Sequence, residues 1–96
     1  MTLAKIPIIL EKVRKEDLDK QILRTAILAE LDAINLYEQM ANLTDNKNLK
    51  MVLLDVAKEE KEHVGEFQYL LLKHDPQQAE ELEDGKKEVQ QLIGEK

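Results

Sequence analysis

Two short stretches indicate the fold expected for this chain: AELDAINLYE at residues 29–38 and EEKEH at residues 59–63. Each stretch lies inside a longer segment rich in Ala, Leu, Glu, Lys and Gln, which are good helix formers. The segments run from about residue 15 to 41 and from about residue 47 to 73, without a helix breaker. The sequence therefore predicts two long helices that fold back on each other as an antiparallel hairpin.

The residues between and after these segments mark where the helices end. Residues 42–48 form the expected turn, where Thr44 or Asp45 can cap the second helix by accepting its free backbone N–H groups. The pair Asp75-Pro76 ends the second helix, because the residue before a proline is disfavoured in helical conformation. Pro76 suits the first turn of a third, weaker helix that extends to about Ile93, with Asp75 as its cap. We expect this third helix to need a neighbour that holds it.

The composition supports a small all-α protein. The chain has 96 residues, of which 43% are hydrophobic and 35% charged, and its 3 Gly and 2 Pro are too few for the turns of a sheet fold. We expect one domain over residues 1–96. Pro7 prevents a regular helix from running through the start, so residues 1–14, with the apolar cluster from Ile6 to Leu10, are expected to form an N-terminal arm.

The charge balance excludes several classes of partner. Asp and Glu total 20 against 14 Lys and Arg, giving a net charge of −6, whereas nucleic acids and anionic membranes bind basic faces. The chain has no Cys, which excludes thiolate metal sites and thiol catalysis. No apolar run approaches the roughly 18 residues of a membrane span. We therefore expect a cytoplasmic protein with no nucleic-acid or membrane partner.

Both long helices carry ionisable groups in the middle of their apolar seams. At alternating steps of four and three, the first seam is Leu23, Ile27, Glu30, Ile34, Tyr37 and Ala41, and the second is Leu49, Leu53, Val56, Glu60, His63, Phe67 and Leu70. A buried carboxylate without a partner costs several kcal/mol, so Glu30, Glu60 and His63 require one. We expect that partner to be a metal ion.

The spacing of these residues brings them to one place. Glu30 and Glu60 are equally far in sequence from Asp45 in the turn, so they reach the same height in an antiparallel hairpin, roughly 20 Å from the turn at 1.5 Å per residue. Glu60 and His63 are three residues apart and share one helix face. Two carboxylates and an imidazole suit iron or manganese, and also zinc.

One hairpin supplies half of a known ligand pattern. Di-iron carboxylate bundles take a Glu from each of two helices and Glu-x-x-His from each of the other two. Two copies of this chain related by a two-fold axis would complete a four-helix bundle with four carboxylates, which balance two divalent ions. A hairpin also cannot bury both of its seams alone, so packing independently predicts a dimer. We expect divalent metal to strengthen this assembly.

The two stretches quoted above resemble the encapsulated ferritins of bacteria and archaea, and the resemblance extends from about Leu23 to Pro76. It implies a half-ferritin whose homodimer builds a di-iron ferroxidase centre with two Fe per dimer, for which other divalent metals can substitute. It further implies that the dimers assemble into a decameric ring inside an encapsulin shell, where the oxidised iron is stored. The expected location is thus a nanocompartment in the cytoplasm.

The resemblance also implies roles for individual residues. Glu30, Glu60 and His63 occupy the positions of the iron ligands, and Tyr37 that of the catalytic tyrosine beside the centre. Asp32 matches one of the acids through which iron enters in some members. The position of another such acid is Ala29 here, so of the two acids only Asp32 carries over to this chain.

Two other functions fit the same residues. A rubrerythrin-like peroxide reductase would use the same centre and would turn over peroxide rather than oxygen. Alternatively, the chain is a non-catalytic helical dimerisation or adaptor module whose polar seam sets the register of the helices. The adaptor would bind no metal.

Overall fold

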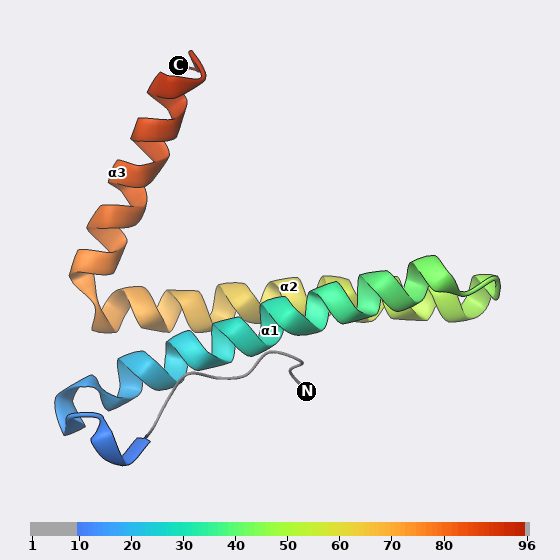
Figure 1. Ribbon diagram of the computed structural model, residues 1–96, viewed down its shortest axis with the longest axis horizontal. Coiled ribbons are helices and arrows are strands. Elements are labelled where there is room, and N and C mark those ends of the chain that lie inside the picture. The colour runs from blue at the N-terminus through green and yellow to red at the C-terminus, as the bar shows by residue number, and fades with distance from the viewer. Residues whose placement is uncertain (1–9, 96) are drawn as a thin grey trace.

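Residues 10–95, which the computed structural model describes, form an L (Figure 1). Two short 3₁₀ helices, η1 (Leu10–Lys12) and η2 (Lys15–Asp17), precede α1 (Leu18–Leu43), α2 (Lys47–His74) and α3 (Pro76–Leu92). The radius of gyration is 16.7 Å, against about 12–13 Å for a compact domain of this length. The all-α class is confirmed. Most of the expected N-terminal arm lies outside the described residues.

The α1–α2 hairpin turns at residues 44–46, as the sequence predicts, but a different residue caps α2. Asn46 has extended backbone angles, and its side-chain oxygen accepts a hydrogen bond from the N–H of Leu49 at 2.9 Å. The Thr44 hydroxyl oxygen instead accepts from the N–H of Asn46 at 3.1 Å. The prediction of Thr44 or Asp45 as the cap was therefore wrong, because the side chain that can reach the third N–H of the helix is the one directly before its first residue.

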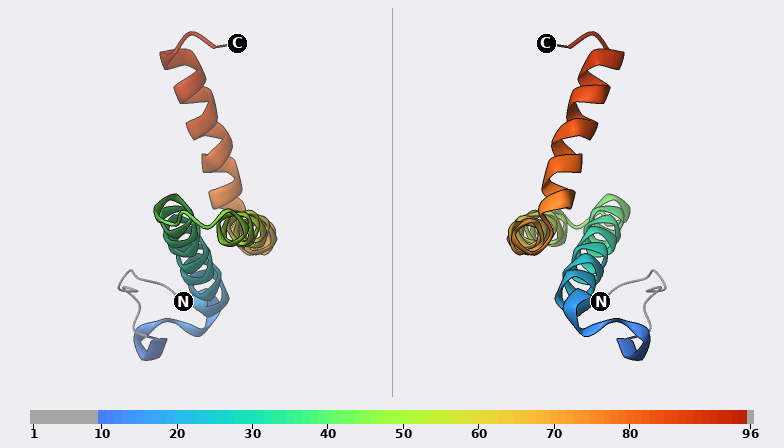
Figure 2. Two further views of the ribbon diagram at one scale, coloured as in Figure 1. Left: turned by 90° about the vertical axis from the view of Figure 1, so that its right-hand side faces the viewer. Right: turned by 90° about the vertical axis from the view of Figure 1, so that its left-hand side faces the viewer.

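The corner between α2 and α3 forms as predicted. Asp75 ends α2, and its Oδ1 accepts a hydrogen bond from the N–H of Gln78 at 3.2 Å, while Pro76 occupies the first position of α3. From this corner α3 projects away from the hairpin rather than running along it (Figures 1 and 2). None of the residues of α3 is buried, which agrees with the expectation that this helix needs a neighbour.

The core is a thin layer of side chains between α1 and α2. Leu23, Ala33, Ile34 and Ala41 are its buried members on α1, and Ala57 and Leu71 are those on α2. The predicted seam of α1 is confirmed at three of these positions. The predicted seam of α2 is confirmed in its middle, where Leu53, Val56, Glu60, His63 and Phe67 are partly buried, but the buried positions are Ala57 and Leu71, one residue further along the helix. Its predicted members Leu49 and Leu70 are 47% and 48% exposed.

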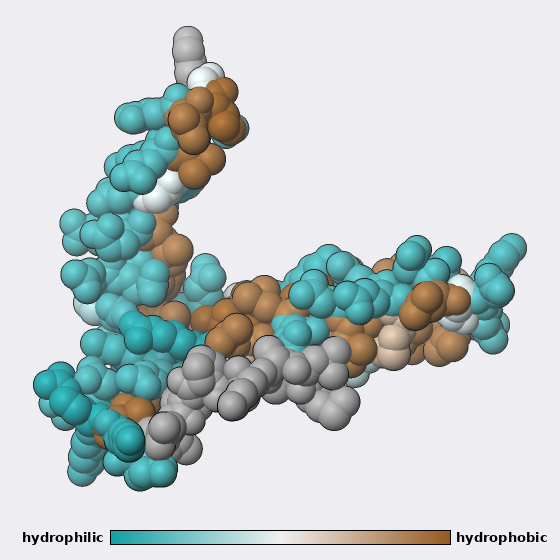
Figure 3. Space-filling model, in the orientation of Figure 1, coloured by the Kyte–Doolittle hydropathy of each residue, from teal (hydrophilic) through white to brown (hydrophobic). Residues whose placement is uncertain are grey.

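Much apolar surface is left uncovered by this arrangement. Apolar side chains extend along the hairpin and on the side of α3 that faces over it (Figure 3). Large exposed hydrophobic residues include Leu28, Leu31, Leu54, Leu82, Val89 and Ile93. A second copy would bury such surface, in line with the packing argument for a dimer. Within residues 10–95, no helix combines the length and the apolar character needed to cross a membrane.

Candidate metal centre

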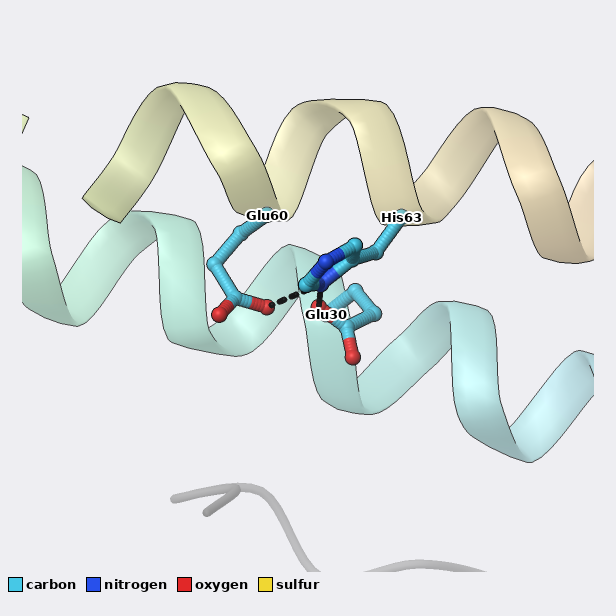
Figure 4. A group of neighbouring side chains, drawn as sticks. All are labelled: Glu30, Glu60 and His63. Atoms are coloured by element: carbon cyan, nitrogen blue, oxygen red, sulfur yellow. Dashed lines mark hydrogen bonds and ion pairs between the residues drawn. The ribbon is translucent and has the colours of Figure 1, made fainter. Parts of the chain in front are cut away.

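Glu30, Glu60 and His63 meet between the two helices of the hairpin. Glu30 is on α1, while Glu60 and His63 lie one turn apart on α2, and all three side chains point into the same space (Figure 4). His63 Nδ1 lies 3.3 Å from Glu30 Oε2 and 3.5 Å from Glu60 Oε2. One potential ligand atom from each residue lies within 4.8 Å of the others. The predicted convergence of these three residues is confirmed.

The centre is sheltered on the carboxylate side and open at the histidine. The side chains of Glu30 and Glu60 are 20% and 18% exposed, whereas that of His63 is 42% exposed. His63 lies at the edge of the α1–α2 contact, on the side of α2 that also carries the exposed Leu70. The hairpin therefore holds two carboxylates inside and presents an imidazole at its surface, an arrangement that a second surface could close.

Within residues 10–95, neither of the two carboxylates, Glu30 and Glu60, is paired with a Lys or Arg side chain. Lys61 is next to Glu60 in sequence, but its Nζ pairs with Glu38 Oε2 at 3.1 Å. His63 is the only basic side chain that the described part of the chain places beside the two carboxylates. Carboxylate oxygens and an imidazole nitrogen are suitable ligands for iron and manganese.

Two further residues were predicted for the site. Tyr37 follows Glu30 by two helical turns and is partly buried, so it lies on the same side of α1 as the centre. Asp32 is partly buried and has a polar partner, and it is not a member of the converging group. Their roles remain predictions. In residues 10–95 no other set of three or more His, Cys, Asp or Glu side chains converges in this way.

Known proteins with similar sequences belong to encapsulin systems. The sequence model of the EncFtn-like family matches residues 7–87. A ferritin-like-encapsulin shell fusion protein of Pyrococcus furiosus is 60% identical over 80 residues, which are 83% of this chain and 23% of that protein. The encapsulin nanocompartment cargo protein EncC of Myxococcus xanthus is 47% identical over 57 residues, 59% of this chain and 44% of that protein. The chain thus spans less than half the length of either relative.

A solved structure has the same fold. The crystal structure of the encapsulated ferritin domain from Pyrococcus furiosus matches with a TM-score of 0.82 and 52% sequence identity, covering 96% of each chain. The similarity therefore includes α3 and the corner as well as the hairpin. Both the family match and the ferritin-like helical fold agree with the resemblance noted in residues 29–38 and 59–63. The chain belongs to the EncFtn-like family of encapsulated ferritins.

Proposed function

We propose that this protein is a ferroxidase that oxidises Fe(II) to Fe(III) at a di-iron centre shared by two copies of the chain. The observation that carries the proposal is the convergence of Glu30, Glu60 and His63 from opposite helices within 4.8 Å. Iron is the substrate of the reaction, and its oxidised form is the product that is stored. Oxygen or a peroxide supplies the oxidant.

The charge and donor types of the site fit two divalent ions per dimer. Each chain contributes the carboxylates of Glu30 and Glu60, so that two chains supply four negative charges against the four positive charges of two Fe(II) ions. Two bound iron ions would supply two electrons together while retaining open coordination positions. The chain's own part is to hold Glu30 and Glu60 as anionic oxygen donors and His63 as a nitrogen donor on rigid helices.

Sharing between two copies follows from the exposure of the site. His63 is 42% exposed and its neighbour on the same flank, Leu70, is 48% exposed, so the centre opens onto a surface that is partly apolar. A second hairpin placed on this flank by a two-fold axis covers the apolar side chains and adds its own three ligands. The resulting four-helix bundle has the two Glu and two Glu-x-x-His contributions typical of di-iron carboxylate proteins.

Tyr37 and Asp32 are assigned supporting roles. Tyr37 is partly buried on the side of α1 that carries Glu30, which suits a tyrosine beside the centre. Asp32 is partly exposed, which suits an acid that meets incoming iron before it reaches the inner carboxylates. Neither residue is needed to complete the group of three ligands.

The proposed partner is an encapsulin shell. One relative is a fusion of a ferritin-like part to an encapsulin shell and the other is an encapsulin cargo protein, according to their names. We therefore place this chain inside an encapsulin nanocompartment, as dimers that assemble into a decameric ring. Because an open ring cannot enclose a mineral, the shell would store the Fe(III) that the centre produces.

The test compares iron oxidation by the wild-type chain with that by Glu60→Ala. Each protein is loaded with Fe(II) without oxygen and then exposed to air, while absorbance in the ferric-oxo band is recorded. Wild type is expected to bind about two Fe per dimer and oxidise them rapidly, and Glu60→Ala is expected to lose the rapid phase. Glu62→Ala is the matched control, because Glu62 is an exposed acid on the same helix outside the ligand group. Equally slow oxidation in all three proteins would instead favour the adaptor module.

A further inference from the structure

The direction of α3 has an identifiable restraint at its first turn. No residue of α3 is buried, and its apolar residues Leu82, Val89 and Ile93, the last directly after the helix, are 46%, 55% and 63% exposed. Packing contacts along α3 therefore do not fix the direction in which this helix projects from the hairpin. Among the described residues, the ion pair nearest to α3 is at the corner, where Arg24 of α1 reaches Asp75, the residue directly before α3.

Asp75 connects three elements through its two carboxylate oxygens. Its Oδ2 accepts a hydrogen bond from Arg24 Nη2 at 2.7 Å, and its Oδ1 accepts one from the backbone N–H of Gln78 at 3.2 Å. Its own backbone N–H donates to the carbonyl of Leu71 in α2. The Asp75 side chain is only 11% exposed, whereas that of Arg24 is 48% exposed. One carboxylate thus caps α3 and ties the start of that helix to α1.

The charges around the corner favour the ionised carboxylate. The backbone hydrogen bond from Gln78 lowers the pKa of Asp75 below its usual value, against the effect of burial, and the hydrogen bond from Arg24 and the positive charges of Lys20 and Arg24 lower it further. The positive charges of Lys20 and Arg24 reach the Asp75 carboxylate from α1, and the Gln78 N–H reaches it from the first turn of α3. The neighbouring titratable group of α2, His74, is exposed. At neutral pH the Asp75 carboxylate is therefore charged, as its ion pair with Arg24 requires.

We infer that the ion pair between Arg24 and Asp75 acts as an electrostatic latch, which fixes the direction in which α3 projects from the hairpin. When either charge is removed, α3 is free to take other directions. The capping bond to Gln78 and the bond to Arg24 use different oxygens, so the two effects are separable. Asn caps helices as well as Asp does, so Asp75→Asn keeps the cap while it removes the charge. The inference concerns the shape of the chain and does not rest on iron chemistry.

The test measures the direction of α3 by pulsed electron paramagnetic resonance on the full chain at neutral pH. Because the chain contains no Cys, Gln39→Cys and Glu88→Cys place one spin label on an exposed position of α1 and one on α3. Labelled protein is mixed with an excess of unlabelled protein so that only distances within a chain contribute. Lys61→Met is the matched control, because it breaks a comparable interhelical ion pair, with Glu38, away from the corner.

The expected result is a narrow distance distribution in the wild-type background and in Lys61→Met, and loss of the narrow peak in Arg24→Met and Asp75→Asn. Helicity by circular dichroism should be unchanged in all four proteins, because the cap is retained. A narrow peak that persists in both corner variants would overturn the latch. Broadening accompanied by loss of helicity would also overturn it, since the pair would then stabilise the helix itself rather than its direction.

Discussion

Adding Mn²⁺ to the metal-free protein should stabilise it strongly, through Glu30 and Glu60. Their ligand oxygens lie within 4.8 Å of each other, and both side chains are about four-fifths buried. Two full charges at that separation repel by about 3.5 kcal/mol at an effective dielectric constant of about 20. A divalent ion placed between them converts this repulsion into attraction. Mn²⁺ suits the same ligands as Fe(II) and lets binding be measured apart from iron oxidation.

The size of the effect can be stated as a change in melting temperature. An ion present at about one hundred times its Kd adds about 2.7 kcal/mol to the free energy of unfolding. For a chain of this length, about 1 kcal/mol corresponds to roughly 4–8 °C in Tm. The expected increase is therefore roughly 10–20 °C when each chain binds one ion. Because a shared site binds metal only in the associated state, the ion should also increase the dimer fraction.

The assay is thermal unfolding followed by circular dichroism, with sedimentation velocity on the same samples, before and after Mn²⁺ is added. Glu60→Gln should be more stable than wild type without metal, because the repulsion with Glu30 is gone, and should lose most of the response to Mn²⁺. Glu62→Gln, at an exposed position outside the ligand group, should respond as wild type does. Equal Mn²⁺ shifts in Glu60→Gln and wild type would refute the reasoning, as would a species distribution that metal leaves unchanged.

Three further predictions concern stability. Asn46→Ala removes the cap of α2 and should lower the free energy of unfolding by about 1 kcal/mol in urea titrations, whereas Asn48→Ala, which removes no cap, should change it little. Ala57→Leu forces extra volume into the α1–α2 contact, where Ala57 is 2% exposed. The substitution should lower the free energy of unfolding by about 1–3 kcal/mol in the same titration. An unchanged urea midpoint would mean that α1 and α2 can move apart at this position without loss of stability. The lowered pKa of Asp75, due first to the N–H of Gln78, adds stability that is present above pH 3.8 and lost as the pH falls further. The urea midpoint of wild type should therefore approach that of Asp75→Asn in strongly acidic buffer, and a pH-independent difference would contradict this assignment.

The candidate site was predictable from the sequence because its geometry is set by helix periodicity. Glu60 and His63 share a face at a spacing of three, and Glu30 meets them because it lies as far before the turn as Glu60 lies after it. The corner was predictable for an equally local reason, since Asp75-Pro76 both ends one helix and starts the next. The candidate site and the corner therefore depend only on residues close in sequence and on the single turn between α1 and α2.

The errors occurred where local pattern leaves more than one solution. Thr44, Asp45 and Asn46 are all good capping residues, and Asn46 is selected because α2 begins at Lys47, the residue directly after it. On α2 the apolar residues cover a wide arc, so that periodicity alone does not say which part of it faces α1. Packing selects the part with Ala57, because a small side chain lets the helices approach closely, and leaves the flank with Leu70 for another surface.

The helices, the turn, the corner and the three residues that converge can all be predicted from the sequence, because each depends on spacing along a regular helix. The packing of the helices was needed to show that Glu30 and Glu60 are mostly buried while His63 is more exposed, and that Arg24 forms an ion pair with Asp75 at the corner. Arg24 and Asp75 are 51 residues apart in sequence, and no periodic pattern connects them. Their contact depends on the rotation of both long helices about their axes, which the close packing of the whole hairpin fixes.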